Sequence, residues 1–343
     1  MMMDMDTYFE RLYDQNRPQY RMPNEKNEAD WKQWRESWQK ALKSDLAGFP
    51  AQYGALNARV VSEVKREEFR QQLVVFDGED GMEIPAYLLV PNGLTEPAPA
   101  VIAVAGHGAG MTEIVGLTPQ HEARALGEGY QKDFAAMLCM QGFVVLAPEM
   151  LGFGMRRFEE DKQKNASQSS CFRMSMNLLM MGKTMSGVRV RDVMRSIEYL
   201  QSLPMVNAER IGAMGISGGG TTLMYTAALD ERLKATVISG AGCTYRDSIL
   251  KIFHCSDNFV PQVYGHGEMC DVLGLCLPRP LLLEAGRDDD IFPLCGVMNC
   301  YEALHKAYQM WDVENRMELD VFEGGHQIHG GRSYEFLQKW LKK

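Results

Sequence analysis

One serine in this sequence stands among glycines in a way that favours catalysis. The segment GISGG, residues 215–219, fits the pattern G-x-S-x-G around Ser217. It joins an apolar, strand-like run to the helical stretch 218–229, which predicts a tight turn that projects the hydroxyl above a sheet. Side chains at positions 215 and 219 would collide where strand and helix pass each other, and glycine removes that collision. The amides that open the helix are then free to stabilise a developing negative charge.

The partners that a nucleophilic serine needs follow it in the order acid, then histidine. Three consecutive aspartates, residues 288–290, follow one apolar run, and His326 follows another run and two glycines. An imidazole takes the serine's proton near neutral pH, and a carboxylate fixes the tautomer of that imidazole. We therefore predict Ser217 as nucleophile and His326 as base, in preference to His329, which lies further from the strand end. The residue pattern alone leaves open which aspartate is the acid.

A second glycine-rich loop is expected to belong to the same site. It reads GHGAG, residues 106–110, and follows the apolar run 101–105. Such a loop supplies a backbone N–H to the oxyanion that forms during acyl transfer. We expect His107 to brace the loop by hydrogen bonds rather than to act as a base, because the site already has one.

Short apolar runs that alternate with helical stretches must position these residues. The predicted strands are 101–105, 143–147, 211–216, 235–240, 281–285 and 317–322, and the predicted helices are 129–141, 187–202, 218–229, 296–310 and 332–342. Continuous apolar strands with crossover helices predict an α/β fold, with a mostly parallel central sheet and helices on both faces. Ahead of them, residues 68–91 indicate a hairpin that turns at DGEDG, residues 77–81.

We predict two parts along the chain. Residues 1–65 form an N-terminal helical extension, in which three tryptophans at helical spacing share one face that packs on the core. Residues 66–343 form the main domain. Two stretches of that domain, 151–186 and 243–278, break the strand–helix alternation directly after strand ends. We interpret them as excursions over the site, because an open α/β sheet places its binding crevice at that edge.

The composition argues against several partners and compartments. The net charge of −9 and the scattered basic residues argue against nucleic acid or an anionic membrane as partner. No apolar run reaches the roughly 18 residues that a membrane span requires. The N-terminus carries acids where a secretory signal needs positive charge, so we expect a cytoplasmic protein with reduced cysteines. A zinc site of His254, Cys255, His266 and Cys270 matches no familiar ligand spacing, and we expect neither a metal nor another cofactor.

These motifs together resemble the α/β-hydrolase superfamily, and within it the dienelactone-hydrolase-like and acetyl-xylan-esterase-like branch. The resemblance rests on GHGAG, GISGGG, AGRDDDIFP and FEGGHQIHG, and covers roughly residues 68–343. Relatives commonly carry G-x-x-D-x-x-x-P around the acid, a spacing that selects Asp289. The resemblance therefore implies the α/β-hydrolase fold, a triad of Ser217, Asp289 and His326, and an oxyanion hole formed by the amides of Gly218 and Ala109.

The sequence also departs from these relatives. Dienelactone hydrolases carry a cysteine where Ser217 stands. The related sugar esterases carry an aromatic residue after the HG pair and an Arg-Gly-Gln motif, where this chain has HGAG and MLGFGMR. Their specificities are therefore not carried over. The stretch APEMLGFGMR still resembles the family's loop after its next strand, which implies that Glu149 and Arg156 line the substrate pocket. His107 of the GHGAG loop is a third candidate for the pocket.

From these observations we predict a serine hydrolase for a small-molecule carboxylic ester, such as an acetyl ester of a carbohydrate or another polar metabolite. A peptidase of the prolyl-oligopeptidase type shares the turn and the residue order, although such enzymes usually carry a large β-propeller. A third hypothesis treats GISGGGTT as a phosphate- or nucleotide-binding loop, but the lysine of that motif is absent. The sequence leaves the oligomeric state open, and in a homo-oligomer the tryptophan-bearing helix would be the natural contact surface.

Overall fold

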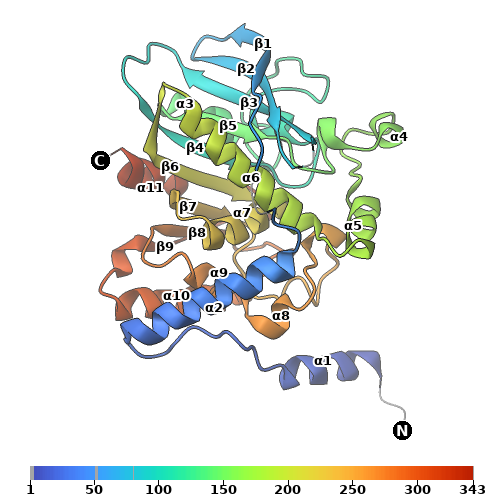
Figure 1. Ribbon diagram of the computed structural model, residues 1–343, viewed down its shortest axis with the longest axis vertical. Coiled ribbons are helices and arrows are strands. Elements are labelled where there is room, and N and C mark those ends of the chain that lie inside the picture. Colours follow the sequence, from blue (N-terminus) through green and yellow to red (C-terminus); the bar gives the residue numbers. More distant parts are fainter. Residues whose placement is uncertain (1–3, 51–52, 80, 343) are drawn as a thin grey trace.

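A nine-stranded sheet organises the part of the chain that the structure describes, residues 4–50, 53–79 and 81–342 (Figure 1). In this computed structural model the strand order is β1-β2-β3-β5-β4-β6-β7-β8-β9. Strands β4 to β9 run parallel to one another, and β1, β2 and β3 pair antiparallel at one side. The strands are β1 (Arg59–Lys65), β2 (Phe69–Asp77), β3 (Glu83–Pro91), β4 (Ala98–Val104), β5 (Val144–Pro148), β6 (Val206–Ile216), β7 (Leu233–Ser239), β8 (Leu281–Gly286) and β9 (Met317–Phe322). The predicted mostly parallel sheet is confirmed.

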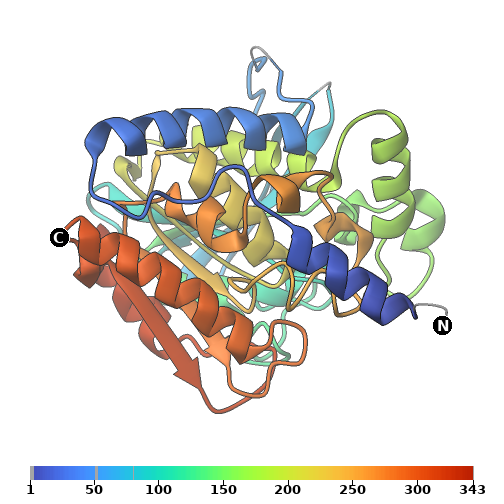
Figure 2. The ribbon, with the colours of Figure 1, turned by 90° about the horizontal axis from the view of Figure 1, so that it is seen from below.

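Helices cover both faces of this sheet. Figures 1 and 2 show α2, α6 and α7 together on one face, and α9 and α10 contribute to the same buried core. Neighbouring residues of β3, such as Leu88 and Leu89, belong to different cores because successive side chains of a strand point to opposite faces. The core that contains Leu89 receives α3 and α11. The predicted class, an α/β sheet with helices on both faces, is therefore confirmed.

The helices differ widely in length and hydropathy. They are α1 (Met5–Gln15), α2 (Glu28–Leu46), α3 (Phe134–Met140), α4 (Glu159–Lys162), α5 (Cys171–Met180), α6 (Met185–Ser202), α7 (Gly218–Leu229), α8 (Val263–His266), α9 (Met269–Gly274), α10 (Leu294–Met310) and α11 (Gly331–Leu341). Among the described residues, none of these helices combines the length and the apolar character that crossing a bilayer requires.

Strand β1 is the main difference from the predicted elements. All seven of its residues are exposed. Its sequence RVVSEVK therefore shows neither the continuous apolar run of a buried strand nor the strict alternation of a half-buried one. It nevertheless pairs with β2 at the edge of the sheet, with a register shift between Val60 and Ser62. The predicted boundary at residue 65 thus separates β1 from the sheet to which it belongs. In the predicted hairpin turn, Asp80 lies outside the described residues.

The N-terminal segment contacts the core through α2. Trp31, Trp34 and Trp38 are 4%, 8% and 0% exposed and belong to the core on the α6 and α7 face of the sheet. The indole N–H of Trp38 donates to the carbonyl of Asp271 at 3.1 Å, and its ring stacks on Tyr20. Helix α1, in contrast, has no buried residue. The tryptophan spacing therefore marks the buried face of α2.

We expect Trp38→Ala to lower the free energy of unfolding by about 3–5 kcal/mol, because it empties a large buried volume and removes the hydrogen bond to the Asp271 carbonyl. Urea unfolding monitored by circular dichroism measures this loss. Phe9→Ala is the control, since Phe9 lies on α1 and is 48% exposed. That variant should stay within about 0.5 kcal/mol of wild type. A Trp38→Ala protein as stable as the Phe9 variant would contradict a structural role for α2.

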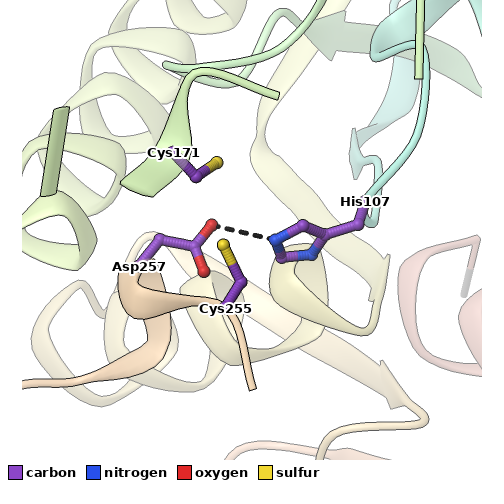
Figure 3. A group of neighbouring side chains, drawn as sticks. All are labelled: His107, Cys171, Cys255 and Asp257. Atoms are coloured by element: carbon purple, nitrogen blue, oxygen red, sulfur yellow. Dashed lines mark ion pairs between the residues drawn. The ribbon is translucent and has the colours of Figure 1, made fainter. Parts of the chain in front are cut away.

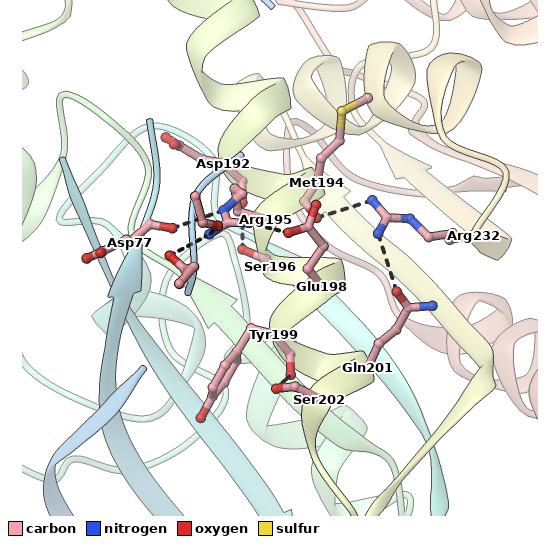
Figure 4. A network of polar contacts seen from close by, with 12 residues as sticks. Asp77, Asp192, Met194, Arg195, Ser196, Glu198, Tyr199, Gln201, Ser202 and Arg232 are labelled. Carbon is pink, nitrogen blue, oxygen red and sulfur yellow. Dashed lines mark hydrogen bonds and ion pairs between the residues drawn. The ribbon is translucent and has the colours of Figure 1, made fainter. Parts of the chain in front are cut away.

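Helix α6 fixes the connection between α2 and β1 through a buried arginine (Figure 4). The Arg195 guanidinium donates to the carbonyls of Gly54 and Ala55 at 3.0 and 3.2 Å. Its Nε donates to the carbonyl of Asp77, at the end of β2, at 3.0 Å, and it pairs with Glu198 one turn along the helix. One side chain therefore ties α6 both to the sheet and to the segment that leads into it.

Candidate active site

Ser217 lies at the turn between β6 and α7, with backbone angles that are unusual for serine. Its φ is 57° and its ψ is −128°, which is a strained conformation for a residue with a side chain. A Cβ on Gly215 would lie 2.9 Å from the carbonyl carbon of Gly219, and a Cβ on Gly219 would lie 2.2 Å from the carbonyl oxygen of Val104. The segment GISGG therefore contains the crowding predicted from its glycines, and Ser217 is 8% exposed.

We expect Gly219→Ala to destabilise the fold by more than about 3 kcal/mol, because backbone atoms of β4 cannot move away from the added methyl group as a side chain could. Thermal and urea unfolding measure this effect. Gly265→Ala adds the same group where nothing lies within 4 Å, so its stability should match wild type. Equal stabilities of the two variants would show that the turn and β4 can move apart enough to accept a methyl group at position 219.

His326 follows β9 and pairs with one aspartate of the predicted triplet. Its Nδ1 lies 2.8 Å from Asp289 Oδ2, and Asp289 Oδ1 accepts hydrogen bonds from the amides of Ile291 and Phe292, each at 2.9 Å. Burial raises the pKa of the Asp289 carboxyl, but the hydrogen bonds from His326 and the two amides outweigh it and lower the pKa below its usual value. Asp289 is therefore ionised at neutral pH and holds the imidazole with Nδ1 as the donor.

The competing aspartates and histidine have other environments. Asp288 and Asp290 are exposed, whereas Asp289 is 5% exposed. His329 Nδ1 lies 2.8 Å from Asp320 Oδ2. The structure thus brings His326 together with Asp289 and gives His329 a partner outside the triplet.

Ser217 and His326 line one cavity of about 320 Å³. The residues of its wall are His107, Tyr130, Ser217, Phe253, His254, Cys255, Asn258, Ile291 and His326. The His326 ring stacks on Tyr130 and Phe292, and its buried Nε2 has no hydrogen-bond partner among the described residues. Because Asp289 engages Nδ1, Nε2 is the nitrogen that can accept a proton from a hydroxyl in the cavity.

Neither of the two predicted oxyanion donors is among the residues that line this cavity, although each lies close in sequence to one that does. Gly218 is the first residue of α7, directly after Ser217, and a Cβ on it would lie 3.1 Å from the His107 ring. His107 lines the cavity, whereas Ala109 is 3% exposed and is not among the lining residues. The GHGAG loop therefore meets the start of α7 at His107.

Glu149 and Arg156, which the resemblance implied as pocket residues, hold the loop after β5 instead. Glu149 is 1% exposed, and its carboxylate accepts hydrogen bonds from the amides of Met111 and Met155 at 3.0 and 3.1 Å. Burial raises the pKa of this carboxyl to about 7. Arg156 pairs with Asp192 at 2.6 Å. Neither side chain lines the cavity described above, because both are engaged by neighbouring backbone and charge.

Several residues of the cavity wall were not predicted from the sequence. Tyr130 donates from its hydroxyl to the His107 carbonyl at 2.6 Å. Phe253, which is 97% exposed, and Asn258 come from the predicted excursion 243–278. Only the position of that excursion after a strand end pointed to them, because irregular segments carry no periodic pattern.

A buried ion-pair network adjoins the cavity at His107. Asp257 Oδ2 lies 3.1 Å from His107 Nε2 and 2.6 Å from Arg189 Nη1. Burial lowers the pKa of His107, but the charge of Asp257 outweighs this effect and raises the pKa to about 9. Neither Asp257 nor Arg189 was predicted, since a charged residue in a helix or loop is usually exposed.

The four residues considered for zinc are not brought together. His266 Nδ1 pairs with Asp45 at 2.7 Å, and His254 Nε2 lies 2.9 Å from the Ser248 hydroxyl. Burial lowers the pKa of His254. Cys255 lies beside His107 instead.

The chain is similar in sequence to known hydrolases. It matches the family described as "Abhydrolase family" over residues 5–319. It is 29% identical to the "Putative hydrolase YtaP" of Bacillus subtilis (strain 168) over 292 residues, which cover 81% of this chain and 90% of that protein.

Two solved structures share its fold. A "putative acetyl xylan esterase" from Bacteroides fragilis superposes with a TM-score of 0.80 at 16% identity, covering 94% of this chain and 82% of that chain. A glucuronoyl esterase from Solibacter usitatus superposes with a TM-score of 0.67 at 14% identity, covering 91% of this chain and 93% of that one. At such low identity the likeness concerns the fold, which is that of the α/β hydrolases.

Proposed function

The chain belongs to the abhydrolase family, and on that premise we propose that it hydrolyses a carboxylic ester of a carbohydrate through an acyl-enzyme on Ser217. The observation that carries this proposal is the shared cavity, which Ser217 and the Asp289-bound His326 both line. The two solved structures with this fold, a "putative acetyl xylan esterase" and a glucuronoyl esterase, support the substrate class.

In the proposed reaction Ser217 Oγ attacks the ester carbonyl while His326 Nε2 takes the hydroxyl proton. The carbonyl electron pair moves onto oxygen. The Gly218 amide and a second amide from the GHGAG loop stabilise this oxyanion; Ala109 is the predicted second donor, and His107 is the loop residue that lines the cavity. The imidazolium then protonates the departing alcohol. Water, activated by the same imidazole, finally cleaves the acyl-enzyme and releases the acid.

The cavity favours a small polar group. Its volume of about 320 Å³ lies near the lower end of small-molecule pockets, which span about 300–1,000 Å³. Tyr130 and Phe253 supply aromatic surface, and Asn258 supplies an amide that can bind a hydroxyl. Aromatic surface beside a few polar groups suits a sugar ring better than a long acyl chain.

Fluorophosphonate labelling followed by a substrate panel tests the proposal. We expect labelling at Ser217 and hydrolysis of acetylated or uronate-methyl-esterified sugars, with little cleavage of short prolyl peptides. Labelling with cleavage of peptides but not of sugar esters would favour the peptidase alternative. Absence of labelling, together with stabilisation by millimolar nucleotide, would favour the phosphate-loop alternative.

A further inference from the structure

Four potential metal ligands from three segments meet beside the cavity (Figure 3). His107 follows β4, Cys171 opens α5, and Cys255 and Asp257 lie in the connection between β7 and α8. One ligand atom of each residue lies within 4.8 Å of those of the other three. Donors around a tetrahedral zinc ion are about 3.3–3.8 Å apart, given Zn–N of about 2.0 Å and Zn–S of about 2.3 Å. Small side-chain movements therefore suffice to bring the four donors onto one ion.

Two of these polar atoms are buried without hydrogen bonds. His107 Nε2 lies 3.1 Å from Asp257 Oδ2, yet it has no hydrogen-bond partner, and neither has Asp257 Oδ1 within the described chain. A buried polar atom without a hydrogen bond is unfavourable, although the ion pair with Asp257 offsets part of this for His107 Nε2. A cation placed between the imidazole and the carboxylate would use the lone pairs of both.

We propose that His107, Cys171, Cys255 and Asp257 bind one divalent cation of the zinc class. Two thiolates, one imidazole and one carboxylate form a donor set that zinc takes in tetrahedral geometry. Four protein ligands leave no open position, so the site is structural and not catalytic. The ion holds the GHGAG loop, α5 and the second excursion together, and so fixes the cavity wall at His107 and Cys255.

Arg189 orients two of the ligands. Its Nη1 donates to Asp257 Oδ2 at 2.6 Å, and its Nη2 donates to Cys171 Sγ at 3.2 Å. Such contacts around a metal site align the ligands and favour their ionised forms. With both thiols and Asp257 ionised, the cluster including Arg189 has two more negative charges than positive ones, which a divalent cation neutralises.

A second group of potential ligands, Glu284, Asp320 and His329, lacks these features. Both carboxylate oxygens of Glu284 already accept hydrogen bonds, including those from the hydroxyls of Ser239 and Ser333 at 2.8 and 2.6 Å. His329 is bound to Asp320. The polar atoms of this group already have hydrogen-bond partners in the protein, unlike those of the cysteine-containing cluster, so we propose no metal there.

Metal analysis of the full chain, purified without chelators or a metal-affinity step, tests the proposal. We expect about one zinc ion per chain by mass spectrometry, and a thiolate-to-cobalt charge-transfer band after exchange with Co²⁺. Cys171→Ser and Cys255→Ser should each reduce bound zinc to less than about a tenth of wild type. Cys295→Ser, which alters an exposed cysteine, should retain it.

Three results would overturn the site. They are a folded wild-type chain that takes up neither Zn²⁺ nor Co²⁺, zinc that persists in both serine variants, and a Cys171–Cys255 disulfide found by peptide mapping. Should the variants fail to fold, X-ray absorption of the wild type decides the matter by counting two sulfur ligands or finding none. These measurements read metal content alone, so their outcome is independent of the proposed esterase activity.

Discussion

Ser217→Ala is expected to lower kcat on an acetylated sugar by about 10⁴- to 10⁶-fold while leaving the protein folded. The variant removes the only protein atom that forms a covalent bond to the acyl group in the proposed reaction. Within the described residues the Ser217 hydroxyl makes no hydrogen bond, so the substitution removes none from the fold. The strained turn is unchanged, since alanine has the same Cβ as serine at this φ of 57°.

Steady-state kinetic assays give kcat and KM of the variant, and urea unfolding in parallel shows whether it is folded. KM should change little if the hydroxyl contributes mainly to the transition state. Ser167→Ala is the control, because Ser167 is exposed in the first excursion and should retain wild-type kcat. A folded Ser217→Ala protein that keeps more than about a hundredth of wild-type kcat would falsify the covalent mechanism.

Much of the sheet could be predicted from the sequence, because its parallel strands are buried on both faces. Strands such as β5 and β8 have every residue buried, so each is a short apolar run in a polar chain. Strand β1 could not be predicted, since it is exposed along its whole length. The short helices of the excursions, α4 and α8, were missed for a related reason: four residues are too few to show a helical period.

The candidate site divides in the same way. Ser217 and His326 each follow a strand within a glycine-marked turn, so local sequence was enough to propose them. Local sequence identified only the aspartate triplet, and the family resemblance was needed to select Asp289. The cavity wall depends on packing between segments remote in sequence, as in the contact of the Tyr130 hydroxyl with the loop at His107. Glu149 shows the opposite failure, since a motif resemblance assigned to the pocket a carboxylate that backbone amides hold inside the protein.

His326→Ala is expected to reduce kcat by about 10⁴-fold or more, because Ser217 then has no base for its proton. Asp289→Asn should cost about 10³- to 10⁴-fold, since an amide side chain no longer stabilises the imidazolium and favours the wrong tautomer. Both effects are measured as kcat on the substrate that wild type cleaves fastest.

The chain offers a matched control for each of these changes. His329→Ala removes a histidine that also pairs with an aspartate at 2.8 Å, but it lies outside the cavity, so kcat should stay within about threefold of wild type. Asp288→Asn and Asp290→Asn alter exposed neighbours of Asp289 and should be equally silent. Residues that act as one unit are not additive, so Ser217→Ala combined with His326→Ala should be no slower than Ser217→Ala alone. Additive losses in that double variant would mean that the histidine serves a step other than activation of the serine.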